Sequence, residues 1–186
     1  RALVQATLPH SDPKANEFVR RNGHFTLSIL APKDVGLPFG RYPRLVLAYL
    51  TTEAVRRKSA DIELGSHFSH FCAALGIPPT TGPRGSLPML REQLQRLFAS
   101  TFQCIFHDES QGRHAGDGFL IAEKRELWWD PRPGKGEAAW GSHVLLSDRF
   151  FREATEAPVP LDLRVLRALR SPFEIDIYVW LTWRFF

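Results

Sequence analysis

Apolar side chains recur every three or four positions in several parts of the chain, and this spacing predicts helices. The longest such stretch follows Pro43, a residue that suits the first helical turn because its missing N–H costs nothing there. We expect a helix from Pro43 to about Lys58. Its predicted buried stripe consists of Leu45, Ala48, Tyr49, Thr52 and Val55.

Two more helices are predicted after a short alternating strand at Ile62–Leu64. Ser66 would cap the first, and Gly76 and Pro78 would end it. Ser86 would cap the second. The inner face of this second helix would carry Leu87, Leu90, Leu94, Leu97 and Phe98, and its outer face Glu92, Gln95 and Arg96.

The hydrophobic period then changes to two, which is typical of strands. Phe102, Cys104 and Phe106 alternate with polar neighbours, and Phe25 to Leu30 forms an earlier strand candidate. A polar turn from Asp108 to Gly118 precedes a second strand that begins at Phe119 and runs towards Trp129. The two strands predict a β-hairpin with a long loop. Another short strand is predicted at Val144–Leu146.

The last forty residues predict further helices. Ser147 and Asp148 would open one, and Asp162 would cap another that runs through Arg170. The final segment alternates as a strand would from Phe173 to Val179. Ser171-Pro172-Phe173-Glu174 instead forms a capping box with proline at the first helical position, so we interpret it as a helix.

Residues 43–129 therefore follow the order helix, short strand, helix, turn, helix, hairpin. This is the order of a winged-helix domain, in which a helix-turn-helix precedes a β-hairpin wing. The predicted fold class is α+β, a winged helix with additional C-terminal helices. We expect an N-terminal extension and lead-in strand at 1–42, the winged-helix domain at 43–146, and a helical segment at 147–186 that leads to a second domain of a longer protein.

Charge points to a polyanion as one partner. The chain has 186 residues and a net charge of +4, and residues 41–100 carry 8 basic and 4 acidic groups. An exposed helix with Arg and Gln can reach base edges or phosphates in a DNA groove. The candidate DNA-binding residues are Arg84, Arg91, Gln95, Arg96 and, at the tip of the expected wing, Arg113. Winged helices also serve as protein-interaction modules, and Glu92 with Arg96 has the spacing of an ordinary helix-surface pair.

The sequence gives little support for metal binding, phosphate binding, catalysis or base stacking. His67, His70 and Cys72 lack the four convergent ligands of a zinc site. Gly134-Lys135-Gly136 lacks the spacing of a phosphate loop, and no nucleophile elbow is present. Trp128, Trp129 and Trp140 are expected to fill space rather than to stack on bases. We expect no enzyme activity, no metal, no cofactor and no membrane span.

Four stretches resemble the conserved region of plasmid-encoded RepA replication initiators. They are Gly36 to Gly65, Leu90 to Ser100, Leu145 to Phe151 and Pro158 to Arg184, in the expected order. The resemblance implies a cytoplasmic bacterial protein that starts plasmid replication by binding repeated sites in origin double-stranded DNA. Its other implied partners are host replication proteins, such as a helicase or an initiator, and a second copy in a homodimer. The alternative function is a dimerisation module with weak, non-specific DNA contact.

Overall fold

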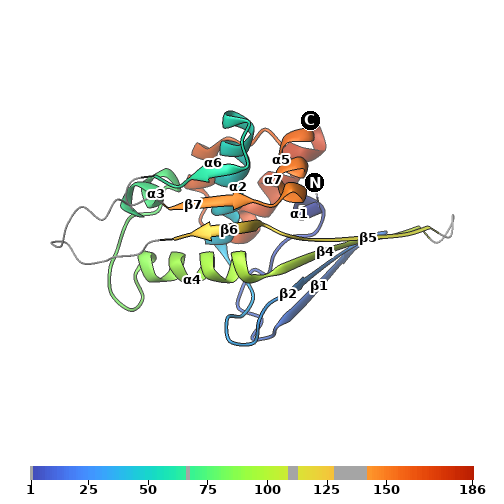
Figure 1. The fold of residues 1–186 in the computed structure, drawn as a ribbon, viewed down its shortest axis with the longest axis horizontal. Helices are drawn as coiled ribbons and strands as arrows, with labels where there is room; N and C mark the ends of the chain where they lie inside the picture. The colour runs from blue at the N-terminus through green and yellow to red at the C-terminus, as the bar shows by residue number, and fades with distance from the viewer. Residues whose placement is uncertain (1, 66–67, 109–112, 128–141) are drawn as a thin grey trace.

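The fold is mixed α+β, as predicted from the sequence. A computed structural model of the chain describes residues 2–65, 68–108, 113–127 and 142–186 (Figure 1). Its helices are α1 Ala2–Gln5, α2 Arg41–Arg57, α3 Phe68–Ala74, α4 Ser86–Ala99, α5 Asp148–Glu156, α6 Leu163–Ala168 and α7 Pro172–Phe185. Its strands are β1 Glu17–Asn22, β2 Phe25–Leu30, β3 Asp61–Glu63, β4 Thr101–Asp108, β5 Arg113–Leu120, β6 Ala122–Glu126 and β7 His143–Leu146.

The larger sheet is antiparallel in the order β1-β2-β4-β5. Ile29 pairs with Phe102, which pairs in turn with Phe119, and the two phenylalanine rings stack at 5.7 Å. The edge strand β1 was not predicted, because its charged residues and alternating exposure carry little hydrophobic signal. Figure 1 shows this sheet extending away from the helices, with α4 leading directly into β4.

The prediction of one hairpin from 102 to 129 is wrong in detail. Residues 113–118, expected in a turn, belong to β5, where Gly116 and Gly118 pair with Ile105 and Gln103 of β4. Backbone hydrogen bonds of the ladder here outweigh the low strand propensity of glycine. The following residues, Ala122–Glu126, form the separate strand β6, which pairs with β7.

The smaller sheet has the order β3-β7-β6. Ile62 pairs with Val144, and both side chains are fully buried. This sheet therefore joins a strand that precedes α3 and α4 to a pair of strands that follows them. In Figure 1 it lies between α4 and the group formed by α2 and α6.

Helix α2 crosses the core and contacts α4, α5, α6 and α7. Leu45 and Ala48 are buried as predicted, but Val55 is 37% exposed, while Leu50 and Ala54 are completely buried. The single predicted stripe was too narrow because neighbours cover the helix on more than one side.

Several predicted helix caps are confirmed. Ser147 accepts a hydrogen bond from the Phe150 N–H, and Asp162 accepts one from the Arg164 N–H. At α7 the capping box of Ser171 and Glu174 is complete, with Pro172 in the first turn, so the helical interpretation of this segment is correct. The helix capped by Asp162 ends at Ala168 rather than Arg170.

Candidate nucleic-acid interface

The connection between α3 and α4 is a hydrogen-bonded loop. The Ser86 N–H donates to the Thr80 hydroxyl over 2.8 Å, and the Thr80 N–H donates to the Ser86 hydroxyl over 2.9 Å. The Ser86 hydroxyl donates to the Pro78 carbonyl. The prediction that Ser86 caps α4 is therefore wrong: Gly85 occupies the N-cap position, and the serine hydroxyl is used by the loop.

This loop fixes how α4 begins. A Cβ at Gly85 would lie 2.4 Å from the Thr80 carbonyl oxygen, so only glycine fits there. Arg84, one residue earlier, is exposed. The loop thus presents Arg84 to solvent directly before the first turn of α4.

The predicted inner face of α4 is confirmed for Leu90, Leu94, Leu97 and Phe98, all at most 2% exposed. Gln95 is exposed, as predicted, and so are Glu92 and Met89. Arg91 is only half-buried and so keeps part of its side chain at the surface. Of the candidate residues on the helix, Gln95 is therefore the exposed one, while Arg91 and Arg96 are partly buried.

Arg96 was expected on the outer face of α4, but its side chain is largely covered. Its side chain is 14% exposed, and its guanidinium pairs with Glu92 at 2.6 Å and donates to the Leu37 carbonyl over 3.1 Å. The segment before α2 crosses α4 at this place, where the Phe39 N–H also donates to the Gln93 side-chain oxygen. Helical spacing describes only the helix itself and gives no sign that residues 37–39 cover one of its faces. The sequence therefore predicted an exposed Arg96.

Arg113 belongs to the larger sheet and not to the smaller sheet that contains β3. It opens β5 opposite Asp108 of β4, and its side chain lies outside the described part of the structure. The strands that share a sheet with β3 are β6 and β7. The residues that connect them, 128–141, are also outside the described residues, together with the three tryptophans at 128, 129 and 140 and the Gly134-Lys135-Gly136 sequence.

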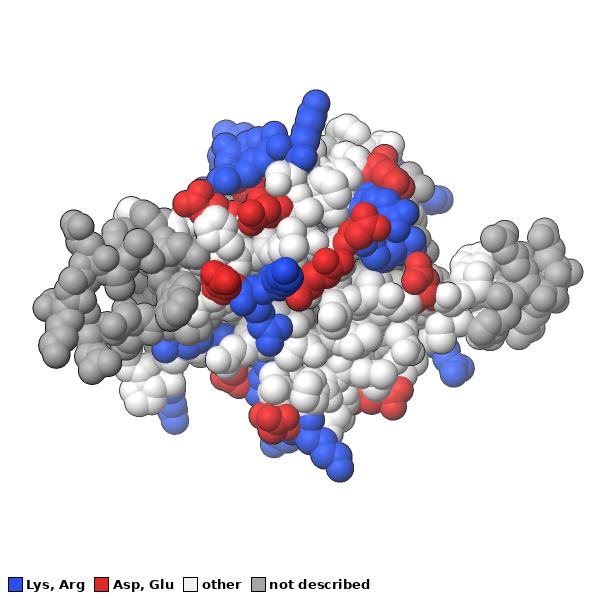
Figure 2. Space-filling view, in the orientation of Figure 1, with Lys and Arg blue, Asp and Glu red and all other residues white. Residues whose placement is uncertain are grey.

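Much of the positive charge in residues 41–100 is already paired. Glu53 binds both Arg56 and Arg57, at 2.5 and 2.8 Å. Burial alone would raise the pKa of Glu53, but the hydrogen bonds from the two arginines outweigh it and lower this pKa. Figure 2 shows basic and acidic side chains interspersed on the face it displays, with no continuous basic field. The positive surface is therefore smaller than the composition suggests.

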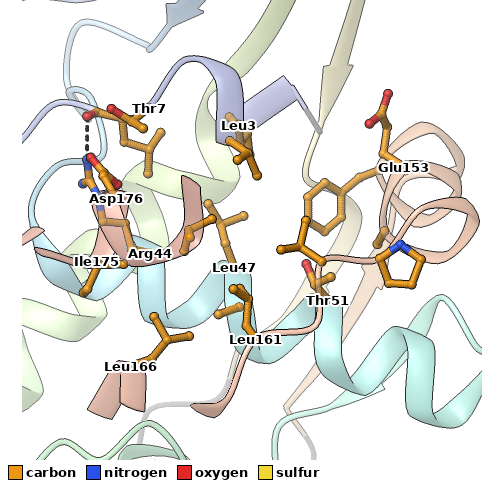
Figure 3. Close-up of a pocket in the computed structure, with 18 of the residues that line it drawn as sticks. Leu3, Thr7, Arg44, Leu47, Thr51, Glu153, Leu161, Leu166, Ile175 and Asp176 are labelled. Atoms are coloured by element: carbon orange, nitrogen blue, oxygen red, sulfur yellow. Dashed lines mark hydrogen bonds and ion pairs between the residues drawn. The ribbon is translucent and has the colours of Figure 1, made fainter. Parts of the chain in front are cut away.

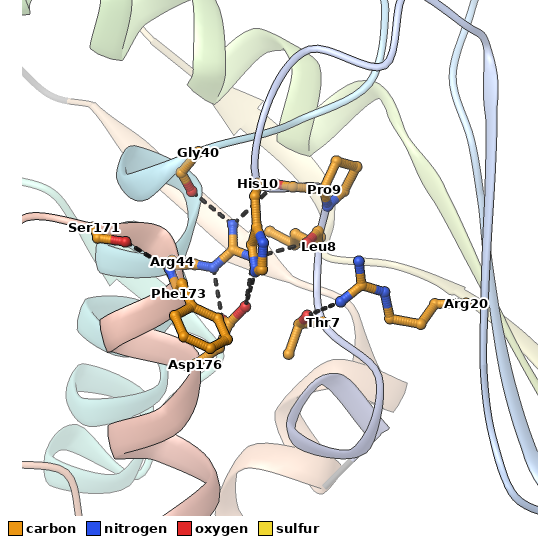
Figure 4. Close-up of polar contacts among 10 residues, drawn as sticks. All are labelled: Thr7, Leu8, Pro9, His10, Arg20, Gly40, Arg44, Ser171, Phe173 and Asp176. Atoms are coloured by element: carbon orange, nitrogen blue, oxygen red, sulfur yellow. Dashed lines mark hydrogen bonds and ion pairs between the residues drawn. The ribbon is translucent and has the colours of Figure 1, made fainter.

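A second polar cluster surrounds Arg44, which is 7% exposed (Figure 4). Its Nε and Nη2 donate to the two carboxylate oxygens of Asp176 over 2.7 and 2.8 Å. The other donors reach the carbonyls of Leu8, Pro9 and Gly40. His10 Nε2 also contacts Asp176, at 2.8 Å. The guanidinium has five N–H donors, and all are used here, so this cluster serves to join α2, α7 and the N-terminal segment.

Beside this cluster lies an apolar cavity of about 140 Å³. Figure 3 shows Leu3 of α1, Leu47 of α2 and Leu161 facing the same space. Ala154 of α5 and Leu166 of α6 also line it. The Arg44–Asp176 pair at one end is already saturated with hydrogen bonds and offers no free polar group. The cavity is therefore a gap between helices with mostly aliphatic walls.

Reactive and metal-binding groups are few in the described residues. These residues contain no cluster of three His, Cys, Asp or Glu side chains that could hold a metal ion, and His67 lies outside them. Burial raises the pKa of both Cys72 and Cys104 to about 11. Among the residues described, no helix has the length and apolarity needed to cross a membrane.

The solved structures with a similar fold include two crystal structures of the same protein. A crystal structure of a selenomethionine derivative of domains 2 and 3 of RctB superposes with a TM-score of 0.67 at 12% identity, covering 98% of this chain and 70% of that chain. Another crystal structure of RctB domains 2–3 gives a TM-score of 0.61 at 14% identity, with coverages of 90% and 64%. At these identities the likeness concerns the fold alone.

Comparison of sequences gives a family. No curated protein matches the chain significantly. Residues 37–186 match the family described as plasmid-encoded RepA protein, and this region contains α2 to α7 and β3 to β7. Because the match spans far more than half of the sequence, the chain belongs to the plasmid-encoded RepA family.

Proposed function

We propose that this chain contains a winged-helix DNA-binding domain of a plasmid replication initiator, and that it associates with double-stranded origin DNA in the bacterial cytoplasm. The observation that carries the proposal is the β3-β7-β6 sheet in a chain of the RepA family. In a winged helix the strand after the first helix pairs with the hairpin after the third. Helix α2, strand β3, helices α3 and α4, and the β6–β7 pair supply these elements in order.

This assignment moves the wing from its predicted position. The wing strands become β6 and β7, because they share a sheet with β3, whereas β4 and β5 pair with β1 and β2. Strands β4 and β5 are then an insertion between the third helix and the wing, and they extend the sheet that β1 and β2 begin before the first helix. Arg113, the first residue of β5, stays a proposed contact to the DNA backbone from this larger sheet.

Helix α4 is the proposed DNA-facing helix. Arg84, Arg91 and Gln95 are the residues on or before it that we propose to contact DNA. Arg84 is fully outside the core, and its loop is held by the Thr80–Ser86 hydrogen bonds. Arg96 takes a supporting role, since its guanidinium is bound to Glu92 and Leu37. We propose that these contacts are dominated by phosphates, because two of the three residues are arginines, whose positive charge favours phosphate oxygens.

A salt titration tests the proposal. The purified chain is titrated with a labelled origin-repeat duplex and with a random duplex of equal length, at salt concentrations from about 50 to 200 mM. Each phosphate contact contributes about −0.9 to the log–log slope, so Arg84 and Arg91 together predict a slope near −2. Arg84→Ala with Arg91→Ala should weaken both duplexes by similar factors and flatten the slope.

Arg152→Ala, an exposed arginine on α5, is the matched control and should bind like the parent. If the double variant also binds like the parent, α4 does not face DNA. If the parent forms stable dimers in light scattering and shows no salt-dependent DNA binding, the alternative function, a dimerisation module, replaces the proposal. Loss of origin binding alone would mean that α4 reads bases.

A further inference from the structure

Helix α7 exposes an apolar face to solvent. Phe173, Ile177, Trp180 and Leu181 are 58%, 42%, 44% and 41% exposed. Their spacing of four, three and one residues places them on one side of the helix. Within α7 only Ile175 is buried, and it points into the core beside α2. Apolar side chains gathered on one exposed face are typical of a binding surface.

The apolar face borders a groove of about 320 Å³ whose opposite wall is strand β1. Arg20 and Arg21 of β1 line this wall. The Arg20 guanidinium donates to the Thr7 hydroxyl over 2.9 Å and lies over the Phe18 ring, and Arg21 is exposed. The groove thus has an apolar wall from α7 and a basic wall from β1; we call it the α7–β1 groove.

The α7–β1 groove has one acidic lining residue, Asp176. Its carboxylate is already bound by Nε and Nη2 of Arg44 and by His10 Nε2. It therefore does not neutralise the arginines of the opposite wall. An occupant that matches the groove combines apolar side chains on one side with carboxylates on the other.

We propose that the α7–β1 groove binds an amphipathic acidic segment of a partner protein. The apolar side of that segment packs on Ile177 and Trp180, and its Asp or Glu side chains pair with Arg21 and Arg20. Single-stranded nucleic acid fits less well. Bases stack on open aromatic faces, whereas the Phe173 ring is already in an edge contact with His10 at 5.9 Å and the rest of the apolar face is partly aliphatic.

A pair of peptide probes tests this proposal with the whole chain. One fluorescent peptide forms a helix with Leu and Phe on one face and Glu on the other, and its twin carries Lys in place of each Glu. We expect the Glu peptide to bind and the Lys peptide not to bind. Arg21→Glu should weaken the Glu peptide by about tenfold or more and allow the Lys peptide to bind. Trp180→Ala should abolish binding of the Glu peptide.

Two controls keep the result specific. Arg152→Glu reverses an exposed charge on α5, and Val165→Ala removes an exposed apolar side chain on α6; neither should change peptide binding. Trp180→Ala should keep its thermal unfolding transition and its affinity for duplex DNA, which separates this proposal from the proposed function. Ile177→Ser is a second variant that should also lose the peptide, in case Trp180→Ala fails to fold.

Three outcomes would overturn the proposal. The first is equal binding of the Glu and Lys peptides to the parent chain. The second is tighter binding of an oligo(dT) strand than of the Glu peptide, lost in Trp180→Ala, which would make the groove a nucleic-acid site. The third is a dimer of the parent chain that becomes a monomer in Trp180→Ala, which would make the occupant a second copy.

Discussion

The guanidinium of Arg96 lies over the ring of Phe39, 5.2 Å from its centroid. This contact, together with the hydrogen bond to Leu37, ties α4 to the segment before α2. Arg96→Ala should therefore lower the free energy of unfolding by about 1–3 kcal/mol, because charged hydrogen bonds and a cation–π contact are lost. DNA affinity of the folded variant should stay near that of the parent.

Denaturant unfolding and DNA titration of the same variant check this prediction. Gln95→Ala, the exposed neighbour, is the control and should change stability by no more than about 0.5 kcal/mol. An unchanged stability with a clear fall in DNA affinity would show that Arg96 contacts DNA.

The buried pair of Arg44 and Asp176 should be essential to the fold. Their side chains are 5% and 15% exposed, so removing one partner leaves a desolvated charge. Asp176→Asn or Arg44→Met should each cost about 3–5 kcal/mol in urea unfolding. The double variant should cost less than the sum of the two.

The exposed pair of Asp162 and Arg164 provides the contrast, with side chains that are 37% and 87% exposed. Arg164→Ala should change stability by less than about 1 kcal/mol. Equal losses in the two pairs would contradict the structural role of the Arg44 cluster.

The capping box of α7 predicts a pH effect. Hydrogen bonds from the backbone N–H groups of Ser171 and Arg170 lower the pKa of Glu174 from its ordinary 4.5. The cap therefore contributes stability that is present above pH 4.5 and is lost as the pH falls through the lower pKa of the folded state. Glu174→Gln should flatten the acid loss of stability just below pH 4.5. Identical acid profiles for parent and Glu174→Gln would refute this role.

Both cysteines should react slowly in the native protein. With a pKa of about 11, a thiol at pH 7.5 is ionised in about one molecule in three thousand. Iodoacetamide labelling followed by mass spectrometry should show slow modification of Cys72 and Cys104 that speeds up with rising pH and with unfolding. Rapid labelling of either native thiol at pH 7.5 would be incompatible with this environment.

The apolar cavity between the helices should be fillable. Ala154 lines it and is 6% exposed, and the cavity volume is about 140 Å³. Ala154→Leu should raise the free energy of unfolding by about 1–2 kcal/mol, since each buried methylene group contributes about 0.8 kcal/mol and some strain offsets it. Ala168→Leu, at an exposed helix position, should have little effect. A destabilised Ala154→Leu protein would mean that the cavity is closed by rearrangement or already filled.

Local signals in the sequence predicted most of the helices. The spacing of Leu90, Leu94 and Leu97 predicted α4, and the residues Ser171 to Glu174 predicted the start of α7, because caps and periodic apolar positions act over a few residues. The partners of the strands were not predictable in this way. The pairings of Ile62 with Val144 and of Ile29 with Phe102 join distant segments, which no local signal indicates. The sequence therefore predicted one hairpin where residues 101–126 contribute strands to two sheets.

In the candidate site, too, features set by local sequence were predictable, and contacts with distant segments were not. Gln95 is exposed as helical spacing indicated, and Arg84 is exposed in the loop before α4, because exposure at these positions depends only on the helix and its own loop. Arg96 is covered because residues 36–39 cross α4, and Arg44 is buried because Asp176 approaches it from α7. An arginine in a helical pattern looks the same in sequence whether it meets solvent or a carboxylate 132 residues away.

The contact between His10 and Asp176 joins residues 166 positions apart. A ribosome adds about 5–20 residues per second, so His10 is made roughly 10–30 s before its partner exists. During that interval the N-terminal segment lacks the anchor that Asp176 provides, and Arg44 has only carbonyl acceptors within reach. Docking of this segment on Asp176 therefore cannot precede the synthesis of α7, and until then the nascent chain keeps these N-terminal residues accessible to chaperones and proteases.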